Sequence, residues 1–188
     1  MSSSENPPPD LGVARLCMAA SLRCPSAKIT AAKGSVVGYT GAAIVNAANE
    51  GMLGGGGIDG AISSAGGDEL YQARKALPVL STGHRVRCRT GDAKTTVAGE
   101  LPCEWVIHAV GPNYHGYCDE GEADVLLYSA YASAMREARR RGLKDVGFSL
   151  ISAGIFRAGR PLKDVLAIGM LACAACTYEG LEEAVLVG

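Results

Sequence analysis

The chain has few of the residues that mark nucleic-acid binding. Aromatic residues make up 5% of its 188 positions, with one Trp and two Phe, and the formal net charge is −1. A near-neutral chain lacks the basic patch of a DNA or RNA binder, and scarce aromatic residues leave little surface on which single-stranded bases could stack. We therefore expect a protein that does not bind DNA.

The sequence also gives no reason to expect a membrane-spanning segment or a signal peptide. The run 165–178 is uncharged and mostly apolar, and its 14 residues are too few to cross a bilayer. The first ten residues are rich in Ser and Pro, with no basic stretch leading into an apolar one. We expect a flexible tail over 1–15, one domain over 16–188, and no membrane association.

Cysteine occurs in a pattern that favours neither disulfides nor zinc. The count of seven is odd and the positions are scattered, which is typical of a reducing compartment, here the cytoplasm or the nucleus. Cys173 and Cys176 form a C-x-x-C, but no second pair accompanies them, and a structural zinc site needs about four ligands. We expect no metal and interpret both as small residues of a buried helix.

Segments of strand and helix character alternate along the chain, which predicts an α/β domain of three layers. Expected strands cover 43–45, 85–89, 105–110, 146–151 and 184–187, and expected helices cover 58–65, 68–76, 125–138 and 161–178. Leu16–Leu22 is compatible with either a strand or a helix. Ligands of α/β folds bind at the carboxyl ends of the strands, where the loops after Val45 and Ile151 are expected to lie.

Glycine is concentrated in one short stretch. Gly54 to Gly57 are four consecutive glycines that run into Ile58-Asp59-Gly60. Glycine loses more conformational entropy on folding than any other residue, so such a run suggests a backbone that approaches a ligand closely, often a phosphate.

Common nucleotide motifs do not explain this stretch. Gly55-x-Gly57-x-x-Gly60 matches the dinucleotide fingerprint, but that motif requires an acidic residue about 20 positions later. No Asp or Glu occurs between Tyr71 and Gly91. The chain also has no G-x-x-x-x-G-K-[ST], which excludes a P-loop.

The polar residues around these loops each allow two interpretations. Asn46 and Asn49 could bond the backbone of their own turn or face a polar ligand. Asp59 could be a helix-start residue favoured by the dipole or a general base beside bound phosphate. Ser152 could be a turn residue or a ligand contact, whereas His108, inside an apolar strand, is best interpreted as a core histidine.

The motifs resemble those of macrodomains, and in particular the MacroD-type ADP-ribosyl hydrolases. The first block is the most specific, and three later blocks agree in order and spacing. The four blocks are Ile44-Val45-Asn46-Ala47-Ala48-Asn49-Glu50 continuing into 53–62, Thr90-Gly91-Asp92-Ala93, Val106-Ile107-His108-Ala109-Val110-Gly111-Pro112, and Ile151-Ser152-Ala153-Gly154-Ile155-Phe156.

This resemblance implies a mixed, mostly parallel sheet between helices and a surface cleft for ADP-ribose. It implies that Asn49 and Asp59 are the catalytic residues. The ligand-binding residues that it implies are Ser35, Val36, Asn46, Gly55, Gly56, Gly57, Ile58, Ser152, Ala153, Gly154, Ile155 and Phe156. No metal and no cofactor belong to this picture.

Three positions depart from the family pattern. Ser35 stands where relatives carry an Asp that binds adenine, and Ser63 stands where a His often follows the catalytic Asp. The second loop, with Arg157 and Arg160, resembles that of viral macrodomains; these two arginines could clamp the diphosphate or lie in solvent.

The resemblance implies a monomeric hydrolase that removes mono-ADP-ribose from acidic side chains of proteins and deacetylates O-acetyl-ADP-ribose. The alternative is a reader module that binds ADP-ribose on proteins without cleaving it.

Overall fold

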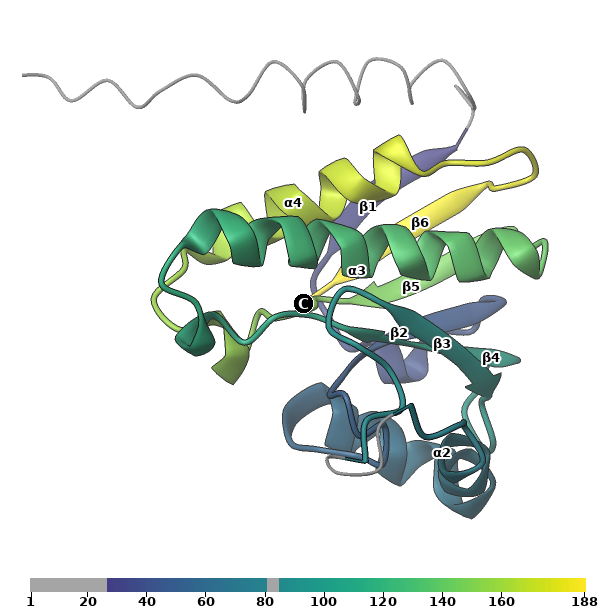
Figure 1. Ribbon diagram of the computed structural model, residues 1–188. Helices are drawn as coiled ribbons and strands as arrows, with labels where there is room; N and C mark the ends of the chain where they lie inside the picture. Colours follow the sequence, from purple (N-terminus) through teal and green to yellow (C-terminus); the bar gives the residue numbers. More distant parts are fainter. Residues whose placement is uncertain (1–26, 81–84) are drawn as a thin grey trace, which may run out of the picture.

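A computed structural model describes residues 27–80 and 85–188. They form three layers, with a six-stranded sheet between two layers of helices (Figure 1). The order of strands across the sheet is β1-β6-β5-β2-β4-β3. All neighbours are parallel except β3, which runs antiparallel to β4. The strands are β1 (Lys28–Ala32), β2 (Ala43–Ala48), β3 (Ala93–Val97), β4 (Trp105–Val110), β5 (Asp145–Ser149) and β6 (Glu183–Val187). The predicted three-layer α/β fold with a mixed, mostly parallel sheet is confirmed.

Helices cover both faces of the sheet. Helices α3 (Glu120–Arg140) and α4 (Leu162–Ala175) pack against each other on one face, and α2 (Gly57–Lys75) covers the other (Figure 1). Side chains alternate between the faces along each strand, so Val45 enters the core beneath α3 and α4 while Ile44 enters the core beneath α2. Short 3₁₀ turns lie at Val36–Gly38 (η1), Tyr114–Gly116 (η2) and Ile155–Arg157 (η3).

Helix α2 consists of two helical segments joined at a kink. Gly67 has φ 65° and ψ −160°, a conformation that is essentially restricted to glycine. The two predicted helices, 58–65 and 68–76, match the segments on either side of it. The kink turns the second segment back toward the first.

The internal strands were predicted more accurately than the edge strands. The predicted strands 43–45, 105–110, 146–151 and 184–187 correspond to β2, β4, β5 and β6. Strands β1 and β3, which were not predicted, are the two edges of the sheet. Four of the five residues of β1 are exposed, so its sequence carries little of the apolar pattern that reveals a strand.

The predicted strand over 85–89 is wrong. This segment instead wraps around a turn, where the backbone N–H groups of Arg87 and Cys88 both donate to the Glu50 carbonyl. The alternation of Arg with apolar residues does not mark a half-buried strand here, since the neighbours Arg87 and Cys88 are both buried.

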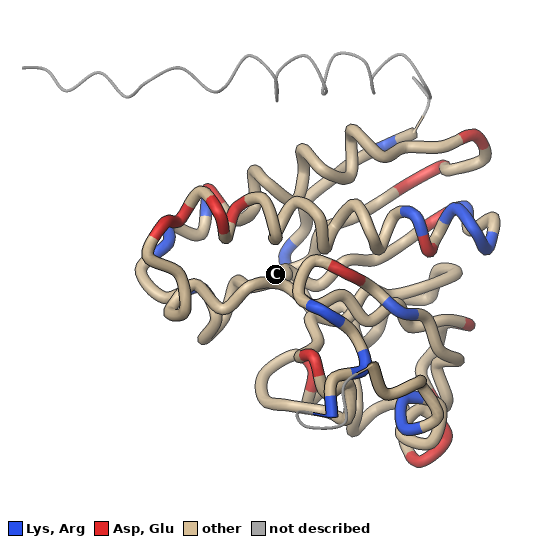
Figure 2. The backbone as a smooth tube through the Cα atoms, viewed as in Figure 1, with Lys and Arg blue, Asp and Glu red and all other residues tan. Residues whose placement is uncertain are grey.

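Helices α3 and α4 agree with the predictions at 125–138 and 161–178. The side chain of Asp119 caps the start of α3 by accepting from the Gly121 N–H at 2.8 Å. Arg139 and Arg140 lie in the last turn of α3 (Figure 2), where their positive charge complements the helix dipole. Cys173 lies buried in α4, as expected of a core helix.

The tail over 1–15 and Leu16–Leu22 lie outside the described residues. Of the helices within 27–80 and 85–188, none has the length and apolar character needed to cross a membrane.

Candidate functional site

A cavity of about 390 Å³ opens where β2, β4 and β5 end. Parallel strands place their carboxyl ends at one edge, so the loops after β2 and β5 meet there, as expected for this fold class. The lining residues are Ala47, Ala48, Asn49, Gly55, Gly56, Gly57, Ile58, Asp59, Gly111, Leu150, Ile151, Ser152, Ala153, Gly154, Ile155 and Phe156. Eleven of the predicted site residues therefore meet in one cavity.

Three predicted site residues are not among the residues that line the cavity. Val36 is 1% exposed and packs into the core beneath α2. The hydroxyl of Ser35 accepts from the Val37 N–H and caps η1. Asn46 lies inside β2, which extends three residues beyond the predicted end at Val45, and its side chain is fully buried. Val36 and Asn46 are thus buried and Ser35 is used as a helix cap.

Asn49 shapes the glycine loop. Its Oδ1 accepts from the N–H groups of Gly51 and Met52, at 3.1 and 3.2 Å, and its Nδ2 donates to the Gly54 carbonyl at 2.8 Å. These are the turn-forming bonds expected of an Asn in a loop. Asn49 also lines the cavity, so its bonds within the turn do not remove it from the candidate site.

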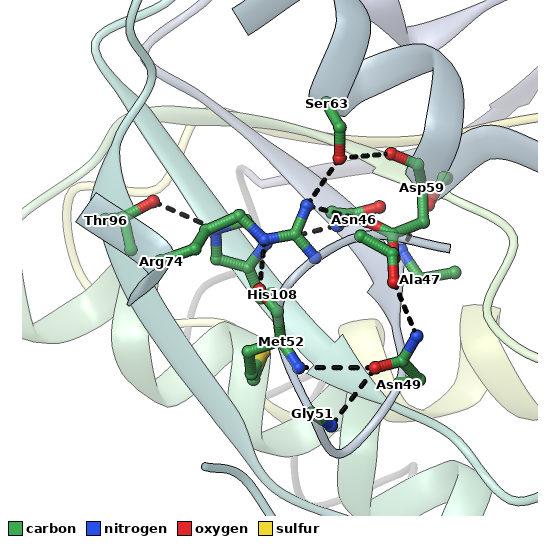
Figure 3. A network of polar contacts seen from close by, with 12 residues as sticks. Asn46, Ala47, Asn49, Gly51, Met52, Asp59, Ser63, Arg74, Thr96 and His108 are labelled. Atoms are coloured by element: carbon green, nitrogen blue, oxygen red, sulfur yellow. Dashed lines mark hydrogen bonds and ion pairs between the residues drawn. The ribbon is translucent and has the colours of Figure 1, made fainter. Parts of the chain in front are cut away.

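Asp59 lies in the first turn of α2 and is 3% exposed. Its Oδ1 accepts from Asn46 Nδ2 at 2.7 Å and forms an ion pair with Arg74 Nη1 at 2.8 Å (Figure 3). Its Oδ2 is buried and has no hydrogen-bond partner within the described part of the chain. A buried polar atom without a partner calls for a ligand or a water, so Oδ2 is the chemically available oxygen of this carboxylate.

Gly55 separates Asn49 from Asp59. A Cβ built on Gly55 would lie 3.1 Å from Asn49 Nδ2 and 3.1 Å from Asp59 Oδ2. The missing side chain leaves an amide donor and a carboxylate acceptor on either side of one small hollow. A reacting group at this point would have a donor and an acceptor within hydrogen-bond reach.

A buried polar chain extends from Asp59 into the sheet. Asn46 Nδ2 lies 3.1 Å from His108 Nδ1, and His108 Nε2 lies 2.9 Å from Thr96 Oγ1 (Figure 3). Since the Asn46 amide nitrogen donates, His108 Nδ1 accepts and Nε2 carries the proton. Burial, together with the positive charge of Arg74, lowers the pKa of His108 well below 6.5. His108 is thus a neutral core histidine with both nitrogens bonded, as its interpretation from the sequence proposed.

The start of α2 can bind an anion through its backbone. Its N-cap residue, Gly56, offers no side-chain cap, so the first N–H groups have no partner inside the helix. The cavity lining contains no Lys or Arg. Negative charge in the cavity would therefore be met by backbone N–H groups and by the helix dipole.

The second loop is braced by its own arginines. Arg157 donates to the carbonyls of Ala153 and Arg160. Arg160 forms ion pairs with Glu120, Asp124 and Asp164 at 2.7–3.2 Å. Both side chains are occupied in holding the loop against the amino end of α3, so neither is free to clamp a diphosphate.

Ser152 connects the second loop to the loop after β4. It has φ 54°, unusual for a residue other than glycine, and its hydroxyl donates to the Pro112 carbonyl at 2.7 Å. Strained residues of this kind cluster at functional sites. The hydroxyl of Ser152 therefore stabilises the loop, as expected of a turn residue, and Ser152 also lines the cavity.

The sequence did not predict Arg74 as a residue of this site, nor the lining residues Ala47, Ala48, Gly111, Leu150 and Ile151. Arg74 is 17 positions or more from Gly54–Gly57, and a basic residue in the last turn of a helix is common. The available signal was the Gly66-Gly67 pair between Asp59 and Arg74, which marks a break where the chain can fold back.

Comparison with known proteins agrees with this geometry. The family model of the Macro domain matches residues 45–168. The chain is 42% identical to a Macro domain-containing protein of Cupriavidus necator over 77% of this chain and 80% of that protein. It is 40% identical to O-acetyl-ADP-ribose deacetylase 1 of Pantoea vagans, over 81% of this chain and 84% of that protein.

A solved structure shows the same fold. The Oceanobacillus iheyensis macrodomain with ADP superposes with a TM-score of 0.74 at 30% identity, covering 87% of this chain and 85% of that one. The domain limits at 16 and 188 and the viral likeness of the second loop stay predictions. With the family model covering most of the chain and the fold in agreement, this protein belongs to the Macro domain family.

Proposed function

We propose that this protein binds ADP-ribose in the cavity and hydrolyses ester bonds on its distal ribose. The substrates are O-acetyl-ADP-ribose and proteins that carry mono-ADP-ribose on acidic side chains. In both, an acyl group is joined to a ribose oxygen. Hydrolysis consumes one water and releases ADP-ribose with acetic acid or the free acidic side chain.

One observation carries this proposal: Asp59 Oδ2 is buried beside the hollow at Gly55 and has no partner among residues 27–80 and 85–188. Oδ1 is engaged by Asn46 and Arg74, so Oδ2 is left to accept a proton from an attacking water. General-base assistance of this kind contributes about 10²–10⁴-fold to a rate. Asn49 Nδ2, which also lies beside Gly55, would donate to a ribose oxygen.

The diphosphate would be held at the start of α2. The uncapped N–H groups after Gly56 meet its negative charge, and the second loop closes the opposite wall. A likeness to a macrodomain with bound ADP and to a protein named O-acetyl-ADP-ribose deacetylase supports the same ligand class. The mechanism uses a carboxylate base, so we expect it to proceed without a metal.

The test combines binding and turnover. Calorimetric titration with ADP-ribose measures affinity, and chromatography follows release of ADP-ribose from O-acetyl-ADP-ribose and from a protein mono-ADP-ribosylated on Glu, with EDTA present. We expect release by the wild type and about 10²–10⁴-fold slower release by Asp59→Asn, which keeps the oxygen that binds Asn46 and Arg74. Asn49→Ala should also lose most activity.

The outcomes separate the two functions that the sequence left open. ADP-ribose binding without release from either substrate would identify a reader module. No heat at millimolar ADP-ribose would contradict both the hydrolase and the reader. Release that stops with EDTA would contradict the metal-independent mechanism.

A further inference from the structure

The Arg74 guanidinium is the most deeply buried cation near the site. Its side chain is 1% exposed, although it lies in the last turn of α2. An isolated charge is strongly disfavoured in such surroundings, so its contacts must offset the loss of hydration. They are the ion pair to Asp59 Oδ1, a bond from Nη1 to Ser63 Oγ at 2.7 Å, and a bond from Nε to the Met52 carbonyl (Figure 3).

The contact between Arg74 and Asp59 depends on the kink in α2. The two residues are fifteen positions apart, which would separate them by about 22 Å along a straight helix. Their charged atoms are instead 2.8 Å apart. The kink at Gly67 folds the second segment back and brings the guanidinium against the first turn.

Arg74 connects both residues that the proposed function requires. It contacts Asp59 directly. Its contact with Asn49 is indirect. Arg74 Nε–H donates to the Met52 carbonyl, and the Met52 N–H donates to Asn49 Oδ1. Met52 has φ 63°, a strained conformation for a residue other than glycine that the surrounding contacts must maintain. One side chain therefore ties the turn of Asn49 to the helix of Asp59.

We propose that Arg74 is the positioning residue of this site. By holding Asp59 Oδ1 and the Met52 carbonyl together, it leaves Oδ2 directed toward Gly55 and sets its separation from Asn49. Ser63 supports the guanidinium: its hydroxyl accepts from Arg74 and donates to the backbone carbonyl of Asp59. The role in turnover rests on the hydrolase activity proposed above.

Arg74→Lys tests this role with the positive charge retained. An ammonium group can still pair with Asp59, but it lacks the planar fork that serves three acceptors at once. We expect kcat for O-acetyl-ADP-ribose to fall about 10- to 100-fold, since small displacements of a catalytic group have effects of this size. The Kd for ADP-ribose should stay within about threefold, because Arg74 does not line the cavity.

A double-mutant cycle shows whether the effect passes through Asp59. In the Asp59→Asn background, Arg74→Lys should change kcat by less than about threefold, because the positioned carboxylate is already gone. Arg87→Lys is the matched control. Arg87 is also buried, at 8% exposure, and donates to the Gly51 carbonyl of the same turn at 3.3 Å, so its replacement should leave kcat unchanged.

Three results would overturn the proposal: unchanged kcat in Arg74→Lys, an equal loss of kcat in both backgrounds, or an equal loss in Arg87→Lys. If Arg74→Lys does not fold, Asp59→Asn/Arg74→Met removes both charges, and activity below that of Asp59→Asn alone would contradict a role through Asp59.

An inactive wild type would refute the proposed hydrolase and leave the positioning role to crystallography. The crystal structure of Arg74→Lys should then show the Asp59 carboxylate rotated away from Gly55. An unmoved Asp59 would refute the positioning role, whatever the activity.

Discussion

Replacing Gly55 with Ala tests whether the hollow between Asn49 and Asp59 is the place of reaction. The new Cβ would lie 3.1 Å from Asn49 Nδ2 and 3.1 Å from Asp59 Oδ2. These contacts are closer than ordinary van der Waals separation, so a neighbour must move by a few tenths of an ångström. Neither is free to do so, because Asn49 makes three bonds in its turn and Asp59 is paired with Arg74.

The expected change in stability is small. Overpacking in a tight site costs about 1–3 kcal/mol, whereas replacing Gly by Ala restricts the unfolded chain and returns about 0.4–1 kcal/mol. The net destabilisation is then on the order of 0–2.5 kcal/mol. Turnover should change more, because the added methyl group occupies the hollow where a water or ribose oxygen would bind. We expect a loss of about 100-fold in kcat.

The assay pairs urea unfolding with the rate of ADP-ribose release from O-acetyl-ADP-ribose. Gly116→Ala is the control, since a Cβ at this exposed glycine would have no neighbour within 4 Å. A folded Gly55→Ala protein that retains kcat within about twofold would refute the reasoning, because it would show that the reaction does not use this hollow. An equal loss in Gly116→Ala would show that the effect is not local.

Three further predictions concern stability. Burial and the charge of Arg74 hold the pKa of His108 well below 6.5, so below about pH 6.5 the unfolded chain takes up a proton that the folded one refuses. Stability should therefore fall by up to about 1.4 kcal/mol per pH unit on acidification. His108→Asn should remove that slope from urea titrations at pH 5.5–6.5, while the exposed control His115→Asn should keep it; equal slopes in both would contradict the assignment. Gly67→Ala should destabilise by about 1–3 kcal/mol because of the strained backbone at φ 65°, and unchanged urea unfolding would show that the kink is not needed. Arg160→Met should lower the free energy of unfolding by about 1 kcal/mol, because three carboxylates lose their shared partner. This loss should be smaller at high salt, which screens the ion pairs. Replacing Lys144, whose pair with Glu182 is exposed, should have no measurable effect, and an equal loss there would argue against a specific role of Arg160.

Most of the fold could be predicted because its internal elements carry strong local patterns. The buried strands β2, β4, β5 and β6 are apolar, and α3 repeats apolar residues at helical spacing. The edge strands lacked such patterns: four of the five residues of β1 are exposed, and β3 carries Lys94, Thr95 and Thr96 at its centre. The segment 85–89 was predicted wrongly because its residues alternate in type but not in burial: Arg87 and Cys88 are both buried beside the turn at Glu50.

The candidate site was likewise predicted only in part. The motifs located Asn49, Asp59 and both loops, since each element of a motif is local and parallel strands bring their ends together. The sequence did not reveal that Ser35 is used as a cap and Val36 as core.

The sequence by itself determined the two small-residue loops and the family, because the conformation of such a loop depends on glycines and amides that are close together in the chain. Only the tertiary structure decided which charges meet. Arg74 pairs with Asp59 because of the kink in α2, and Arg160 pairs with Asp124 of α3. The uncharged amide of Asn46 on β2 likewise meets Asp59 on α2 only in the folded chain. The physical reason is that an ion pair depends on distance in space, and residues far apart in the chain come within reach only once the helices have packed against the sheet.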